Sequence, residues 1–453
     1  MSNEEKTIDL NQSINSKSEE FKSLSRDLQG NILSPHARDN SAQIFIEFND
    51  QESARKFIRK YLVDRITTSA KQKADSEAFK IGKSNGLRTF INFSLSMNGY
   101  KFLNIEEHKI PMDSSFRNGM KSKQRVLKDP VINLWEDEYQ KEWHAIMIVS
   151  NKSHKILRNR VSTIKKELNA AAKSIYVEMG KGIRNNEGNH IEHFGYVDGI
   201  SQPHMLTDKI DDGKVSVENW NPAGRLSLAL VKDPGGAGPN SFGSYLVFRK
   251  LDQNVKAFRL AEKKLAEKMQ ISVDYAGAQM VGRYRNGTPL IPISPPQPTS
   301  AGKMNDFDFS SDRTTGSKCP FGSHIRKTNQ RGSGKPDGVQ FPRRGITYGG
   351  NLSTDAESGV GLLFMAYNSN IGGQFEFMQS AWVNNAHFPG GTNGPNGIDS
   401  IIGQGNDTVG QAYFKKWGDN RSVFRENPSL GGFVTMKGGE YFFTPSKSFL
   451  KNI

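Results

Sequence analysis

The chain has 453 residues, of which 35% are hydrophobic and 24% charged, and its 27 Phe and 12 Tyr are enough to furnish real cores in two or three domains. The formal net charge of +14 raises the question of a nucleic acid or an anionic membrane as partner. No compact basic stripe interleaved with aromatic residues and no zinc-finger or RNP-type motif accompanies this charge, so we expect no nucleic-acid partner.

Cysteine content and hydropathy bear on the compartment. The single cysteine, Cys319, excludes a disulfide within the chain, which fits a reducing compartment. The polar N-terminus has no apolar signal core, and no run of about 18 apolar residues predicts a membrane-spanning helix. We therefore expect a cytoplasmic protein that does not enter a membrane.

The first half of the chain begins with a polar stretch, residues 1–22, that we expect to be a disordered arm. AQIFIEF (42–48) predicts a strand, and apolar residues at helical spacing predict a helix over residues 51–66. WHAIMIVSN (143–151) predicts another strand, followed by a Lys-rich helical segment at 153–172.

The second half repeats this order of elements. GSYLVFRKL (243–251) predicts a strand, residues 254–269 a helix with one apolar face, residues 361–370 a strand and residues 374–382 a helix. Each half thus reads as strand, helix, long insertion, strand, helix. This pattern indicates two related α+β units, each an antiparallel sheet with helices on one face.

Three segments far apart in the sequence carry residues suited to chemistry. GYVDGISQP (195–203) places Asp198 between glycines, CPFGSHIRKTNQR (319–331) contains His324, and FPRRGITYGG (341–350) contains Arg343 beside Arg344. Taken singly, each has a plainer interpretation: a turn Asp usually caps its own backbone amides, a lone His is usually structural, and paired Arg usually binds a surface anion.

Together these segments resemble motifs of the dye-decolourising peroxidases, a family of haem enzymes. Gly195, Asp198 and Gly199 match the family's Gly-x-x-Asp-Gly motif, and residues 319–331 resemble its His segment, with Gln330 where a proline is more usual. Further landmarks match in the same order, so that the resemblance spans roughly residues 25–450: LQGNIL (28–33), FRNGM (116–120), RRGITYG (343–349), GLLFMAY (361–367) and FFTPSKSF (442–449).

The resemblance implies an α+β fold with two ferredoxin-like domains, residues 23–215 and 216–453, each an antiparallel sheet with peripheral helices. Haem b is then expected in the C-terminal domain, under the loop that carries Asp198. His324 would be the proximal iron ligand, a normal role for a neutral imidazole. Asp198 and Arg343 would face the open side, where hydrogen peroxide binds.

Other residues receive expected roles around the same haem from their positions in the chain, Arg326 on the helix that starts at His324 and Asp399 after the helix at 374–382. Gly199 and Ile200 would lie against the porphyrin with the Asp198 loop. Arg326 is expected to pair with a haem propionate, with a surface position as the alternative. Asp399 is expected to hold the second ring nitrogen of His324, with a loop cap as the alternative.

Two candidate sets stay open. Leu362 and Phe364 lie two apart on a predicted strand and share a face, so they would wall the pocket or belong to the core. Arg344 is adjacent to Arg343, and the family pattern favours the first of the pair as the residue that faces the pocket.

Cys319, an alternative iron ligand, precedes a proline without the downstream glycine pattern of thiolate haem proteins, so we expect a buried thiol.

Cleaving peroxide requires a proton to move from one oxygen to the other and positive charge near the departing oxygen. An aspartate can move the proton, and an arginine, which does not deprotonate, can supply the fixed charge. Since a free aspartic acid has a pKa of about 3.9, we expect activity to favour acidic pH.

The leading hypothesis is a haem peroxidase that reduces hydrogen peroxide through a ferryl intermediate and oxidises organic donors, such as dyes and phenolic compounds, by one-electron steps. The alternative is a haem carrier or sensor with little turnover, which would keep His324 but would not need Asp198 or Arg343. A structural or nucleic-acid-binding role is suggested only by the net charge. The resemblance also allows a homodimer.

Overall fold

The computed structural model describes residues 7–84, 86–212, 215–294, 297–299, 304–332, 337–390, 396–405 and 409–453. Its first half contains a four-stranded antiparallel sheet in the order β4-β1-β3-β2. The strands are β1 (Asn40–Phe48), β2 (Phe90–Leu95), β3 (Ala145–Asn151) and β4 (Ala172–Lys181). With α2 (Gln51–Lys56) after β1 and α8 (His154–Leu168) after β3, the connection is the βαββαβ of ferredoxin-like folds.

The second half repeats this order. Its sheet runs β13-β8-β10-β9, so that the last, first, third and second strands lie side by side as in the first half. The strands are β8 (Phe242–Gln253), β9 (Ile346–Tyr348), β10 (Gly361–Asn368) and β13 (Val434–Thr444). Helix α9 (Val255–Met269) follows β8, and two π-helical segments, Gly372–Glu376 and Met378–Val383, follow β10. The expected α+β fold with two related units is confirmed.

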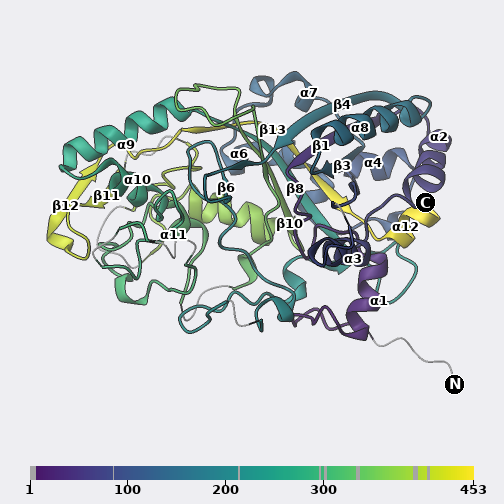
Figure 1. Ribbon diagram of the computed structural model, residues 1–453. Coiled ribbons are helices and arrows are strands. Elements are labelled where there is room, and N and C mark those ends of the chain that lie inside the picture. The colour runs from purple at the N-terminus through teal and green to yellow at the C-terminus, as the bar shows by residue number, and fades with distance from the viewer. Residues whose placement is uncertain are drawn as a thin grey trace.

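The two sheets join into one. Phe443 of β13 pairs with Leu95 of β2, and at the other end of the strand order the Thr347 hydroxyl of β9 donates to the Lys181 carbonyl of β4 at 2.5 Å. The strands therefore enclose a common core, in which the ring of Phe45 from β1 lies 5.0 Å from that of Phe248 in β8. Figure 1 shows these strands between the helices of the first half on one side and α9, α10 and α11 on the other.

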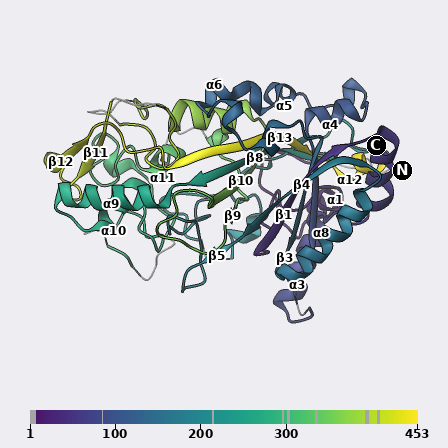
Figure 2. The same ribbon diagram turned by 90° about the horizontal axis from the view of Figure 1, so that it is seen from above.

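Local sequence explains the helices that cover this core. In α8, Ser153 caps the first turn by accepting from the Ile156 amide, and the buried Leu157, Val161, Ile164 and Leu168 recur at helical spacing. In α9, Asn254 caps in the same way. Figure 2, seen from above, places α8 and α9 at opposite ends of the molecule.

The remaining elements are short. The other helices are α1 (Glu19–Asp27), α3 (Ser69–Lys80), α4 (Met97–Phe102), α5 (Ser114–Asn118), α6 (Gln124–Leu127), α7 (Asp137–Gln140), α10 (Val273–Val281), α11 (His324–Thr328) and α12 (Lys447–Asn452). The other strands are β5 (Ile183–Arg184), β6 (His190–Ile191), β7 (Val231–Lys232), β11 (Gln411–Phe414) and β12 (Val423–Glu426). Among the described helices, none is both long and apolar enough to cross a bilayer.

The expected disordered arm is wrong for residues 7–22. Ile8 and Ile14 are buried, the Ile14 amide donates to the Met205 carbonyl, and Ser18 caps α1. The polar composition of this stretch concealed two apolar anchors that pack against residues far along the chain. Residues 1–6 of the predicted arm lie outside the described part of the chain.

Candidate active site

A cavity in the second half of the chain gathers the residues of all three motifs. Its walls come from one face of β8 and β10, from α11, from the π-helical segments and from the loop that carries Asp198. Alternate residues of each strand point into it because side chains on one face recur every second position. These lining residues are Arg249, Leu251 and Gln253 of β8 and Leu362 and Phe364 of β10.

His324 enters the cavity from the first residue of α11. Its Nδ1 hydrogen-bonds to Asp399 Oδ2 at 2.9 Å, and no partner of its Nε2 is found among the described residues. The imidazole is partly exposed to the cavity, whereas Asp399 is fully buried. Burial opposes charge on the ring, but the Asp399 carboxylate outweighs it and raises the pKa of His324.

Asp399 is itself held in place. Its Oδ1 accepts from the amides of Ile401 and Ile402 at 2.8 and 2.9 Å, so that Oδ2 stays directed at the imidazole. The loop-cap interpretation and the histidine-partner interpretation therefore both describe this carboxylate, one through each oxygen. The arrangement fixes the ring and leaves Nε2 directed to the cavity.

The loop of residues 195–199 carries Asp198 into the lining of the same cavity. Gly195 and Gly199 have φ of +89° and +77°, a conformation that a side chain at either position would strain. The Gly199 amide donates to Asp198 Oδ1 at 2.6 Å, and the carboxylate is otherwise exposed to the cavity, as are Gly199 and Ile200. The glycines thus set the direction of a carboxylate that the short turn cannot bury.

The structure separates the two adjacent arginines. Arg343 lines the cavity and is in no ion pair among the described residues, and its amide donates to Gln202 Oε1 at 2.9 Å. Arg344 turns away and donates from Nε to the Asn31 carbonyl and from Nη2 to the Ile32 carbonyl. Because neighbouring residues of an extended segment face opposite ways, only Arg343 can serve the cavity.

The expectation that Arg326 faces a propionate is wrong. Arg326 is buried outside the cavity, where it donates to Asp312 Oδ2 at 2.7 Å and to the Asp312 carbonyl, and its guanidinium stacks over Phe321 at 4.3 Å. Its charge is satisfied by a carboxylate that lies 14 residues upstream, so a second anion is not needed there.

Two other arginines supply the positive charge that Arg326 does not. Arg283 lines the cavity, and Arg331 lies behind Ser201, to which it donates at 2.7 Å. Both are buried, and among the described residues neither contacts a carboxylate. Burial lowers the pKa of Arg283 to about 10. Two buried guanidiniums without an anionic partner indicate that a bound group brings its own negative charge.

These residues fit a haem. A cavity with apolar walls such as Phe364 and Ile200, an imidazole whose Nε2 has no partner among the described residues and the buried guanidinium of Arg283 match a flat apolar ring with a ligand-binding metal and anionic substituents. Cys319, the alternative ligand, does not line the cavity, and burial raises the pKa of its thiol to about 11. It stays a protonated thiol, a poor iron ligand.

Glu192 is a cavity residue that the motifs did not single out. Its carboxylate accepts from the amides of Phe194 and Tyr196 at 2.7 and 2.9 Å and from Gln253 Nε2 at 2.6 Å. It thereby ties the turn that precedes Asp198 to the end of β8. Burial nevertheless raises its pKa to about 7, because desolvation outweighs these hydrogen bonds.

The stability of Glu192→Gln relative to the native protein is expected to increase as pH rises, because only the native protein carries the titrating carboxyl group. The folded protein holds a proton on Glu192 up to a pH of about 7, whereas the unfolded chain releases it near the usual value of 4.5. Stability contributed by this group is therefore full below about 4.5 and falls as pH rises to 7, by about 3 kcal/mol. Melting temperatures of both proteins from pH 4 to 8 test this; a constant difference between them would contradict it.

The residues that the motifs did not predict, Glu192, Arg283 and Arg331, share a reason. Arg331 belongs to the His324 segment, but the sequence around Arg331 and around Arg283 does not predict that either side chain is buried. Their common signal, buried charge beside a cavity, exists only after folding.

Comparisons with known proteins agree with this geometry. Residues 27–184 match a family model described as the DyP dimeric alpha+beta barrel domain, and residues 192–388 match the C-terminal domain of Dyp-type peroxidases. The multifunctional dye peroxidase DyP2 of Amycolatopsis is 38% identical over 98% of this chain and 100% of its own length.

Solved structures give the same result. A DyP-type peroxidase of Anabaena superposes with a TM-score of 0.89 and 39% identity, covering 97% of each chain. A dye-decolorizing peroxidase in complex with 2,6-dimethoxyphenol gives a TM-score of 0.79 and 26% identity, over 94% of this chain and 98% of that one. With both family models matched in order along most of its length, this chain belongs to the dye-decolourising, DyP-type haem peroxidases.

Proposed function

We propose that this peroxidase binds haem b through His324, reduces hydrogen peroxide with the help of Asp198 and Arg343, and oxidises dyes and phenolic compounds. The observation that carries the proposal is the convergence on one cavity of an imidazole fixed by Asp399, a free carboxylate and an arginine outside any described ion pair. The phenol complex of a relative supports phenolic donors.

Each residue has a separate task. His324 would hold the iron through Nε2, while Asp399 keeps the proton on Nδ1 and increases the electron density of the ring. Arg283, which lines the cavity, would pair with a propionate, and Arg331 behind Ser201 would add positive charge. Haem, when bound, would supply the redox-active iron that reduces peroxide to water and then accepts electrons from the donors.

Asp198 and Arg343 prepare the peroxide. The Asp198 carboxylate, held at one oxygen by the Gly199 amide, would accept a proton from one oxygen of hydrogen peroxide and return it to the other, so that the O–O bond breaks and water leaves. The haem would take up the remaining oxygen and supply the two electrons. Arg343 keeps its proton and stabilises negative charge on the departing oxygen. Leu362 and Phe364 keep this side of the cavity apolar, which strengthens both interactions.

His324→Ala is expected to lose haem affinity by at least about 10-fold, because the side chain that binds iron is removed. Hemin is titrated into the native protein and the variant while the Soret band is followed, and added imidazole should restore the band. His108→Ala, which removes an exposed histidine of the first half, is the control and should bind as the native protein does. Equal hemin affinity and an equal Soret band in all three proteins would contradict His324 as the ligand.

The proposal extends to the setting of the enzyme. A single cysteine fits the reducing cytoplasm, and a second copy of the chain is a partner beside peroxide and the organic donor, as the dimeric domain of the family suggests. We place the domain boundary between β4 and β8, in the connecting stretch that contains the expected position, residue 215.

A further inference from the structure

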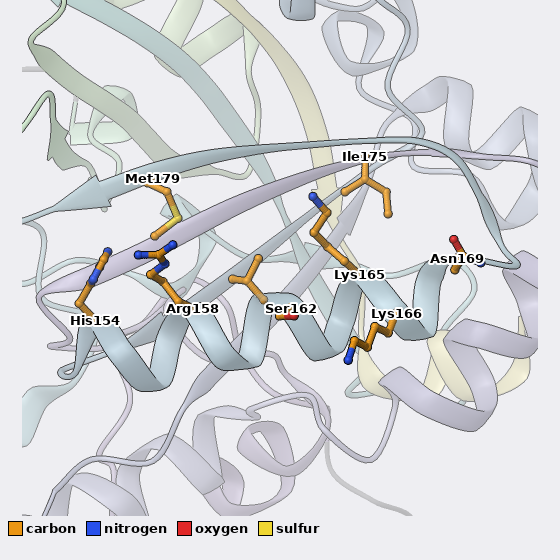
Figure 3. A pocket seen from close by; sticks show the side chains of 9 residues that line it. His154, Arg158, Ser162, Lys165, Lys166, Asn169, Ile175 and Met179 are labelled. Atoms are coloured by element: carbon orange, nitrogen blue, oxygen red, sulfur yellow. The ribbon is translucent and has the colours of Figure 1, made fainter.

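A second concavity lies far from the candidate active site, between α8 and β4. It has a volume of about 1050 Å³ and is open to solvent along the helix. Figure 3 shows His154, Arg158 and Lys165 extending from α8 toward the strand, and Ile175 and Met179 extending from β4 toward the helix. We call this concavity the α8 groove.

The rim of the α8 groove is cationic. Four of its lining residues, His154, Arg158, Lys165 and Lys166, are basic, and none is acidic. Among the described residues, none of these four forms an ion pair. The carboxylates of β4 and β1 are engaged elsewhere, since Glu178 accepts from tyrosine hydroxyls and Lys250, and Glu47 pairs with Lys173. The positive charge of the rim therefore lacks a partner within the described chain.

The floor of the α8 groove is apolar. Val161 of α8 lies against Ile175 and Met179 of β4, which share one face of the strand with Val177 because they recur every second residue. All three strand residues are only half-buried, whereas the other face, which carries Tyr176, packs against Phe45 in the barrel. Half-exposed aliphatic residues below unpaired cations are typical of a surface that another molecule covers.

The shape and chemistry select the kind of partner. A bilayer cannot reach aliphatic side chains at the bottom of a groove below charged ones. A single-stranded nucleic acid needs aromatic platforms, and the lining contains no Phe, Tyr or Trp. We infer that the α8 groove binds an acidic segment of a partner protein in which carboxylates alternate with aliphatic side chains, the carboxylates meeting Arg158 and Lys165 and the aliphatic groups meeting Ile175 and Met179.

The test uses the haem-loaded, full-length protein and a fluorescein-labelled peptide in which aspartate and glutamate alternate with leucine. Binding is followed by fluorescence anisotropy. Replacing the acids by their amides, or leucine by serine, should each weaken binding at least about 10-fold, which corresponds to about 1.4 kcal/mol. Raising the salt concentration should weaken binding to the acidic peptide as well, because the rim charges are exposed.

A matched pair of protein variants locates the site. Arg158→Glu with Lys165→Glu should weaken peptide binding at least about 10-fold, whereas Lys155→Glu with Arg160→Glu makes the same change of charge on the same helix outside the lining and should have little effect. Peroxidase activity should be unchanged in both, which reports intact folding.

The inference is overturned by equal weakening in both double variants, by no binding of the peptide, or by a serine peptide that binds as tightly as the leucine peptide. If a labelled oligonucleotide binds more tightly than the peptide and loses affinity only in the Arg158 and Lys165 variant, the ligand of the α8 groove is a nucleic acid and not an acidic peptide. If the oligomeric state changes only in the Arg158 and Lys165 variant, the groove is an interface with a second copy of this chain.

Discussion

Asp198→Asn is expected to lower kcat/KM for hydrogen peroxide by about 10²–10⁴-fold while haem binding is retained. The substitution keeps the size of the side chain and the hydrogen bond from the Gly199 amide, but it removes the group that accepts a proton. Stopped-flow absorption at the Soret band, with peroxide in excess, measures this rate. Among the described residues, Glu192 is the one other carboxylate that lines the cavity. Because it already accepts from three donors, it cannot replace Asp198 as the base.

Glu192→Gln provides the matched control, since it makes the same chemical change within the same cavity. It should lower kcat/KM for peroxide far less than Asp198→Asn, because Glu192 orients the loop and does not exchange the proton. An Asp198→Asn protein with native turnover would remove Asp198 from the mechanism and favour a haem carrier or sensor. Equal losses in the two variants would instead indicate that loop geometry, which both residues share, limits the rate.

Local patterns in the sequence predicted the elements well because their cause is local. The helix expected at residues 254–269 is observed at Val255–Met269, and the strand expected at 42–48 is β1, which begins two residues earlier. The helix expected over 51–66 changes from α to π geometry at Phe57, a change that apolar spacing does not reveal. The joining of the two sheets depends on strands from both halves, so no local pattern predicts it.

The candidate site was predictable only as far as the motifs reach. Spacing could not bring Asp399 to His324, because 75 residues separate them and the contact follows from the fold of the second half. The same holds for Arg326, whose direction is set by the buried Asp312, and for the arm at residues 7–22, whose position is set by Ile8 and Ile14. Polar composition and charge describe a segment, whereas burial depends on what the rest of the chain places beside it.

One buried ion pair connects the two halves of the chain at the cavity wall, and removing only one of its partners is expected to be costly. Arg249 of β8 and Asp129, which follows α6 in the first half, are almost fully buried and meet through two hydrogen bonds, one of 2.8 Å between Nη1 and Oδ2. The guanidinium also lies over the Phe375 ring at 5.4 Å. The pair thus connects an insertion of the first half to a strand that lines the cavity of the second.

Asp129→Ala is expected to lower the free energy of unfolding by about 3–5 kcal/mol, because it leaves the Arg249 charge buried without a counter-ion. For units of this size, that loss lowers the melting temperature on the order of 10 °C. Glu357→Ala, which breaks the exposed pair with Lys256, should leave the melting temperature unchanged.

The double substitution Asp129→Leu with Arg249→Met distinguishes the penalty of burying an unpaired guanidinium from the net stabilisation that the ion pair provides. Because it removes both charges and keeps most of the volume, it should recover much of the stability that Asp129→Ala loses. A double variant that melts as low as Asp129→Ala would mean that the hydrogen-bonded pair itself, and not the penalty of an unpaired guanidinium, stabilises the junction between the two halves. If Asp129→Ala has the same melting temperature as the native protein, water reaches Arg249 and the wall of the haem cavity is open at that point.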